Sequence, residues 1–241
     1  MAFLHGRLTS VWFNEFSLTP YLNSAGLSAT GDTADTTVFG NTWKTAVAGQ
    51  GSATASFGGF HDVDLTELDQ GALGQDSGVL TYCPGGGAVI GDVARLALVI
   101  ETSLSTSSPV GDAVAITWDA LSQSSVGFGA VLHPLGEDTN TTTGATKDEA
   151  AATATGWMAH LHVTLVDGGA WVVKLQDSAD GSSWADVTGG AFASLSAVGS
   201  ERIVSAAATT ALRRYIRYAA TRTGGTAGDG ITFALAVART R

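Results

Sequence analysis

The chain has 241 residues, of which 44% are hydrophobic and only 14% are charged. This hydrophobic content excludes an intrinsically disordered protein, and a single cysteine, Cys83, excludes an internal disulfide framework. The formal net charge of −10 is uneven, because residues 1–120 carry 3 basic and 12 acidic side chains and residues 121–241 carry 9 and 10. An acidic first half disfavours tight binding to nucleic acid, which requires Lys and Arg to neutralise phosphates.

Glycine is abundant, with 31 residues, and proline is scarce, with 4. This composition favours many short strands and tight turns over long helices. The N-terminus has no apolar region of the secretory type, and no run approaches the ~20 apolar residues that span a bilayer. We therefore expect a protein that is made in the cytosol and stays soluble until it assembles.

The first 60 residues predict an arm at 1–9, a strand from Val11 to Leu18 and an extended segment over 27–39. A long polar loop over about 36–51 follows, and such a loop in an otherwise tight β sequence needs a role outside its own domain. Residues 52–60 then alternate strictly between apolar and polar side chains, which predicts a half-buried strand.

The pattern over 64–73 predicts the one short helix, with Asp64 and Glu67 as a capping box and Gly74 as the stop. Asp62, Asp64, Glu67 and Asp69 cluster at its start. Paired carboxylates can perform acid–base chemistry, but at a helix N-terminus they are also favoured by the helix dipole. We attribute the cluster to capping and solvation, with a charged wall facing a partner as the alternative.

Further strands are predicted from alternating apolar residues, with a Ser/Thr-rich turn at 103–108 and a linker or long surface loop at 136–155. The predicted strands are 79–82, 96–100, 114–118, 126–135, 161–165, 171–175, 203–204, 212–218 and 233–237. Strand–turn–strand spacing of this kind is typical of β-sandwiches. We place a domain boundary between residues 136 and 137, with a single composite domain as the alternative.

Three groups of side chains could suggest chemistry. His160 and His162 lie two apart on one strand face, but a metal site needs a third ligand, so a solvated or interface face is the simpler interpretation. The segment 177–181 lacks the acidic ligands of a calcium loop and is better explained as a turn held by Asp side chains. The glycines at 85–87 are not followed by the Lys of a phosphate-binding loop.

The only basic cluster consists of Arg213, Arg214, Arg217 and Arg222. Interleaved Tyr and Arg can bind single-stranded nucleic acid, but ion pairs between subunits fit the nearly neutral second half better. Neither a nucleophile elbow nor a Cys–His pair at a plausible spacing is present in the sequence. We therefore expect no enzymatic activity and no cofactor.

Several motifs resemble the major tail tube protein of long-tailed bacteriophages with non-contractile tails. In the first half they are D-T-T-V-F-G-N-T-W-K at 35–44, G-F-H-D at 59–62, G-D-V-A at 91–94 and P-V-G-D at 109–112. In the second half, V-K-L-Q-D-S-A-D-G-S-S-W at 173–184 and R-R-Y-I-R at 213–217 resemble the C-terminal β-sandwich of such virion proteins. Together these motifs cover most of the chain.

The resemblance implies a mainly β fold, with a tail-tube-type sandwich or barrel over 1–136 and a C-terminal β-sandwich over 137–241. It also implies rings of six copies that stack into a virion tail tube around the tape measure protein and later the passing duplex DNA. The expected partners are therefore further copies of the chain and other tail proteins, with no membrane. Other virion roles, such as head decoration or tail completion, and a carbohydrate-binding module remain alternatives.

The resemblance also assigns roles to particular residues. The arm and the loop over 36–51 are expected to reach the next ring, and the acidic first half is expected to build a lumen along which DNA can slide. The inter-ring candidates are Thr37, Phe39, Trp43, Lys44 and Gln50. The acidic lumen candidates are Asp62, Asp64, Glu67 and Asp69, and the inter-subunit candidates are Arg213, Arg214 and Arg217.

Overall fold

The computed structural model describes residues 5–61, 77–207 and 210–239. These ranges contain sixteen strands and one short 3₁₀ helix, η1 (Gly6–Leu8), so the mainly β fold expected from the sequence is confirmed. The helix predicted over 64–73 lies outside the described residues. Within the described ranges, no helix combines the length and the apolar character needed to cross a membrane.

Eleven strands form the larger sheet. Eight of them follow one another in the order β14, β11, β16, β8, β6, β5, β1, β2, and β7, β4 and β3 continue from the second half of β6. The bounds in the first half of the chain are β1 (Ser10–Phe13), β2 (Phe16–Ser17), β3 (Leu22–Asp35), β4 (Ala46–Phe60), β5 (Gly78–Cys83), β6 (Val93–Ser107) and β7 (Ala115–Ser122). The others are β8 (Gly127–Asp138), β11 (Trp157–Val166), β14 (Gly199–Val204) and β16 (Ile231–Arg239).

Five strands form the smaller sheet: β9 (Thr142–Thr143), β10 (Lys147–Asp148), β12 (Ala170–Ser178), β13 (Ala185–Ala191) and β15 (Tyr215–Thr223). β9 and β10 both pair with β15. They come from the 136–155 stretch that we expected to be a linker or a surface loop. Its polar residues instead complete one edge of the smaller sheet.

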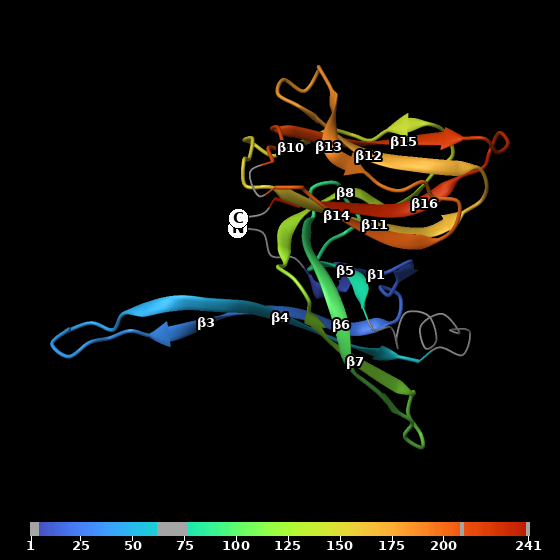
Figure 1. The fold of residues 1–241 in the computed structure, drawn as a ribbon. Coiled ribbons are helices and arrows are strands. Elements are labelled where there is room, and N and C mark those ends of the chain that lie inside the picture. Colours follow the sequence, from blue (N-terminus) through green and yellow to red (C-terminus); the bar gives the residue numbers. More distant parts are fainter. Residues whose placement is uncertain (1–4, 62–76, 208–209, 240–241) are drawn as a thin grey trace.

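The sheets stack in four layers, because the larger sheet folds over itself (Figure 1). The smaller sheet lies against β11 and β16, these strands lie against β1 and β5, and β1 and β5 lie against β4 and β7. Three apolar clusters fill the spaces between successive layers. We call the middle space, which contains Trp12, Cys83, Met158, Ala234 and Ala236, the seam.

The alternation of side chains along β4 and β16 determines which side chains pack into which of the spaces between layers. In β4, Ala53, Ala55 and Phe57 are buried and the intervening residues are exposed, as the period of two predicted. In β16 both faces are buried. Phe233, Leu235 and Val237 point into the cluster beneath the smaller sheet, and the alanines between them point into the seam, where a small side chain lets two layers approach closely.

Two local predictions were wrong for the same reason. Residues 103–107 were expected to form a turn, but they are the end of β6 and pair with β7 over Ser103↔Asp119 to Ser107↔Ala115. Val11 to Leu18 was expected to be one strand, but it forms the β1–β2 hairpin with Asn14 at a positive φ of 50°. In both cases hydrogen bonding to the next strand along the chain decided the structure, and local composition does not report such pairing.

Strand β8 passes through the boundary that we expected between residues 136 and 137. Its first half pairs with β6, from Val93↔Ala130 to Leu96↔Gly127, and its whole length pairs with β16. The two halves of the chain therefore share a strand, and backbone hydrogen bonding is continuous between them.

Candidate assembly surfaces

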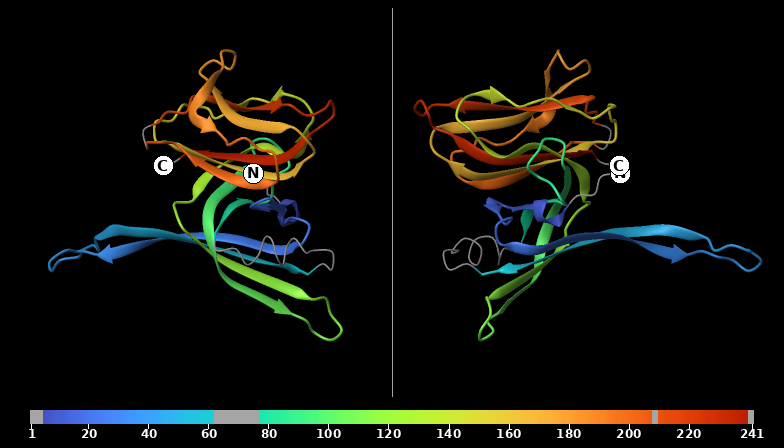
Figure 2. Two further views of the ribbon diagram at one scale, coloured as in Figure 1. Left: turned by 45° about the vertical axis from the view of Figure 1, so that its right-hand side comes forward. Right: turned by 180° about the vertical axis from the view of Figure 1, so that it is seen from behind.

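The β3–β4 hairpin projects far beyond the rest of the molecule (Figure 2). Its register runs from Leu22↔Gly59 to Asp35↔Ala46, so residues 46–51 are strand and the connecting turn covers only 36–45. The loop expected over 36–51 is thus shorter. Gly, Ala, Ser and Thr dominate both strands, so the sequence gives only a weak indication of a strand here. Each strand is held extended by its pairing with the other.

The turn of this hairpin carries four of the five inter-ring candidates, Thr37, Phe39, Trp43 and Lys44. Phe39 and Trp43 are 109% and 84% exposed. The fifth candidate, Gln50, lies in β4, several residues from the turn.

The turn is held at its base by hydrogen bonds. The Thr37 amide donates to the Asp35 carboxylate at 2.8 Å, and the Thr45 amide donates to the Thr37 hydroxyl at 3.0 Å. Hydrogen bonds from the side chain and the amide of Thr37 lower the pKa of Asp35, because they favour its charged form. The base of the turn is ordered although its apolar side chains face water.

Four strands, in the order β3, β4, β7 and the second half of β6, form a sheet with two open edges. Among the described strands, β3 pairs only with β4, and the part of β6 from Ile100 to Ser107 pairs only with β7. Within the described part of the chain, the outer edge of β3 and that of residues 102–107 therefore have no strand partner. An open edge without proline or lysine is a template for pairing with another chain.

One face of this four-stranded sheet packs on the core, and the other is polar. On the polar face, the Asp119 carboxylate accepts a hydrogen bond from the Ser103 hydroxyl at 2.9 Å. Hydrogen bonds from Ser56 and Ser103 lower the pKa of Asp119, so it stays ionised. The acidic candidates Asp62, Asp64, Glu67 and Asp69 lie outside the described residues.

The basic cluster is engaged within the chain. Arg214 and Asp148 form a bidentate pair with distances of 2.7 and 2.6 Å, which pins β10 beside the start of β15. Arg217 donates to the Gln176 side chain at 2.9 Å and covers the Trp184 ring at 4.2 Å from its centroid. Arg213 lies 3.8 Å from the Asp177 carboxylate. Their proposed role between subunits would require these contacts to be shared or exchanged.

His160 and His162 are fully buried in the seam, so the solvated face considered from the sequence was wrong. Nδ1 of His162 lies 2.7 Å from the Asn14 carbonyl, and Nδ1 of His160 lies 3.1 Å from the Leu80 carbonyl. A carbonyl only accepts, so both Nδ1 atoms carry the proton. The Thr81 hydroxyl then donates to Nε2 of His162 at 2.8 Å and lies 3.2 Å from Nδ1 of His160.

Burial holds both imidazoles in the neutral form. Desolvation lowers the pKa of His162 to about 4. Desolvation also lowers the pKa of His160 well below its ordinary value, and electrostatic repulsion from His162 and Arg202 acts in the same direction. The described residues contain no group of three or more His, Cys, Asp or Glu side chains placed to hold a metal ion. The pair is thus a hydrogen-bonded contact between the two halves, and its partners Thr81 and Asn14 carried no sequence pattern that would have identified them.

A carbohydrate-binding module would need aromatic side chains displayed on its sheet, but the tryptophans of the C-terminal half are packed or covered. Trp157 and Trp171 are 0% exposed and belong to the core beneath the smaller sheet, and Arg217 covers Trp184. The turn predicted at 177–181 is present. The Asp180 carboxylate accepts hydrogen bonds from the Ser182 and Ser183 amides at 2.9 and 2.7 Å, and these lower its pKa.

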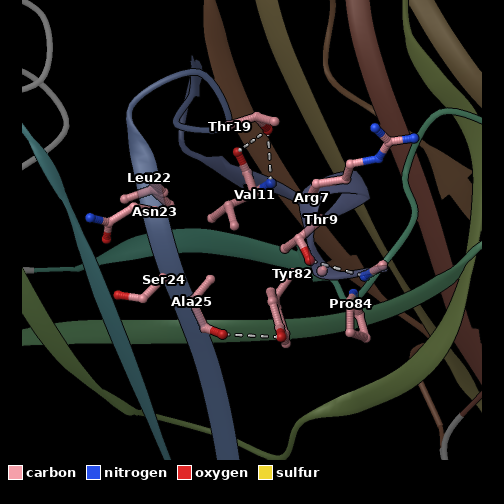
Figure 3. A pocket seen from close by; sticks show the side chains of 12 residues that line it. Arg7, Thr9, Val11, Thr19, Leu22, Asn23, Ser24, Ala25, Tyr82 and Pro84 are labelled. Atoms are coloured by element: carbon pink, nitrogen blue, oxygen red, sulfur yellow. Dashed lines mark hydrogen bonds between the residues drawn. The ribbon is translucent and has the colours of Figure 1, made fainter. Parts of the chain in front are cut away.

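A groove of about 880 Å³ lies at the root of the projecting hairpin (Figure 3). We call it the root groove. Residues from η1, β1, the start of β3 and the end of β5 line it, and Val11, Leu22 and Tyr82 supply apolar surface. Among the described residues that line it, Arg7 alone is charged. Nothing in the sequence marked this groove, because its walls come from four separate segments.

Comparisons with known proteins give structural likenesses of low similarity. No family model matches the chain. No curated protein matches it. A chain in the structure of the virion of a native gene transfer agent particle overlaps 52% of this chain and 97% of its own length, with 15% identity and a TM-score of 0.41.

Two other structures overlap nearly the whole chain. The SPP1 Dit protein, described as a paradigm of the hub adsorption apparatus in phages that infect Gram-positive bacteria, covers 97% of this chain and 100% of its own, with 11% identity and a TM-score of 0.38. A chain of the activated phage p2 baseplate covers 97% and 99%, with 10% identity and a TM-score of 0.36. Likenesses at these TM-scores do not place the chain in a fold family.

Proposed function

We propose that this chain is a structural virion protein whose copies join into rings, and that the rings stack into the tail tube of a long-tailed phage. The four-stranded sheet with two open edges is the observation that carries the proposal. Among the described strands, the outer edge of β3 and that of β6 over residues 102–107 pair with no other strand of the same copy. If β3 of one copy pairs with β6 of the next, the contact is head-to-tail, and repetition of such a contact can close into a ring.

In such a ring, the core face of each four-stranded sheet points outward and its polar face lines the lumen. That face carries Ser56, Ser103 and an ionised Asp119. Hydroxyls and a carboxylate offer no cation to hold phosphates, so duplex DNA can pass without being retained. The same arrangement leaves the smaller sheet, with the strands β11 and β16 that it covers, on the outside of the ring. The tape measure protein, other tail proteins and passing DNA are then the partners.

Hydrogen exchange measured by mass spectrometry, combined with negative-stain microscopy, tests the proposal. We expect hollow rings or tubes in concentrated or triggered preparations, with peptides over 22–35 and 100–107 protected relative to the monomer. Strand β13 at the edge of the smaller sheet serves as the internal control and should exchange equally in both states. Assemblies in which 22–35 and 100–107 gain no protection contradict the edge-pairing proposal.

The form of the assembly separates the alternatives. Stacked tubes support the tail tube, and single rings that never stack indicate a different tail component, such as a completion protein. A chain that remains monomeric at every concentration and trigger contradicts both.

A further inference from the structure

The tip of the projecting hairpin exposes three large apolar side chains to water. Val38, Phe39 and Trp43 are 64%, 109% and 84% exposed within six residues. A two-stranded ribbon is marginal in water without further packing. These side chains therefore call for a partner surface that the described part of one copy does not supply.

The root groove has the properties that such a tip requires. Its apolar walls include Val11, Leu22, Tyr82 and Pro84. Its volume of about 880 Å³ is within the range that encloses a compact organic group such as two neighbouring aromatic side chains. The charge that its described lining carries is positive, on Arg7, and the hairpin carries Asp32 and Asp35 against Lys44, a net negative charge.

Geometry excludes the copy's own groove as the receptor. The groove includes residues 22–25 at the root of the hairpin, and the tip begins after Asp35 at the other end of the same strand. At about 3.3 Å per residue, the two features lie about 40 Å apart along one ribbon. A ribbon cannot fold its tip back onto its own root, so the groove that receives the tip belongs to another copy.

We propose that Val38, Phe39 and Trp43 of one copy insert into the root groove of a second copy, an inference that rests on the proposed function and names the contact between its rings. Tip and groove are different surfaces, so the contact is heterologous and repeats along an axis. Because they lie at the two ends of one strand, successive copies are spaced by the length of the ribbon, about 40 Å.

Disulfide cross-linking tests the contact. The variant Val38→Cys/Asn23→Cys places one thiol beside the tip aromatics and one in the groove, and keeps Phe39 and Trp43. The native Cys83 is 0% exposed and does not compete. We expect oxidation of the concentrated protein to give a ladder of multimers. The matched control Val38→Cys/Thr188→Cys, with its second thiol on β13 outside the groove, should stay monomeric.

A groove-filling variant separates this contact from ring formation. Gly6→Trp should fill the groove and yield single rings that do not stack, because Gly6 lines the groove, lies outside the proposed ring edges and has open space around an added side chain. Gly6→Ala is the matched control that still stacks. Stacked tubes without cross-links in the cysteine variant, or stacking by Gly6→Trp, would overturn the tip-in-groove contact and leave the tube intact. A cross-linked ladder without rings would support the contact and contradict the tube. A spacing between successive copies far from the ribbon length would also overturn the contact.

Discussion

The hydroxyl of Thr81 lies 2.8 Å from Nε2 of His162, inside the seam between the two halves of the molecule. The two residues come from β5 and β11, which are distant in sequence and belong to different layers. Because Nδ1 of His162 donates to the Asn14 carbonyl, Nε2 can only accept, and Thr81 is its donor. This one hydroxyl satisfies an imidazole that water does not reach.

Thr81→Val should therefore destabilise the fold more than its small change in shape suggests. Valine keeps the volume but removes the donor, and leaving a buried acceptor unpaired costs roughly 1–3 kcal/mol. Urea unfolding at pH 7.5 measures this loss. Thr117→Val, on the exposed face of β7, is the matched control and should change the free energy of unfolding by less than about 0.5 kcal/mol. Equal effects of the two substitutions would contradict a structural role for the Thr81 hydroxyl.

Stability should fall as the pH drops below about 6.5. His133, His160 and His162 have a pKa lowered by burial, so the folded chain holds them neutral where the unfolded chain takes up protons. Stability is then full above the unfolded pKa and declines toward the folded one, which is about 4 for His162. The slope reaches at most ~1.4 kcal/mol per pH unit for each group.

Urea midpoints at pH 7.5, 6.0 and 5.0 measure this dependence. Removing one buried imidazole with His162→Gln should flatten the curve. His5→Gln, at an exposed position, should leave it unchanged. A stability that is constant from pH 7.5 to 5.0 would mean that the seam tolerates charged imidazoles.

Replacing residues 37–44 by Asn-Gly should leave the subunit folded and prevent stacking. The replacement keeps the paired strands, since Asn-Gly suits a tight hairpin, and it removes Phe39 and Trp43. Circular dichroism and urea midpoints should match those of the native chain, and microscopy should show no tubes. Phe39→Ser/Trp43→Ser, which keeps the turn length, should give the same result. Normal tubes from either variant would exclude the tip as a contact.

Cys83 should be inert in the native protein. Its thiol is fully buried in the seam, and burial raises its pKa to about 12, so almost no thiolate forms at neutral pH. We expect no reaction with a thiol reagent until urea unfolds the chain. Val38→Cys, with its thiol at the exposed tip, is the positive control. Rapid native labelling of Cys83 would indicate that the seam opens.

The sequence predicted most strands because their alternation is local information. Leu161 and Val163 mark the apolar face of β11 correctly, and the opposite face was expected to be solvated or an interface. It is buried, because β1 and β5 cover His160 and His162. The sequence of a single strand does not reveal whether a second layer covers its polar side. The buried hydrogen bonds of His160 and His162 with Thr81 could therefore not be recognised from the sequence.

The aromatic contact candidates could be chosen from the sequence because large apolar side chains are uncommon in a polar turn. Phe39 and Trp43 are aromatic residues in a polar turn, and composition alone identifies them. The root groove and the two open edges are different, since they depend on which strands meet. The register of β3 with β4 and of β6 with β7 is set by pairing over tens of residues. Such features require the three-dimensional structure.

Strand β8 belongs to both halves of the chain, and this sharing has a mechanical consequence. A force applied to the smaller sheet and to the strands that it covers reaches the four-stranded sheet through the β8–β6 hydrogen bonds and the packed seam. These contacts join the two halves directly. In the proposed tube, a strain at the outer surface would thus be transmitted to the inner wall. We therefore expect the two halves of the molecule to turn together as one unit.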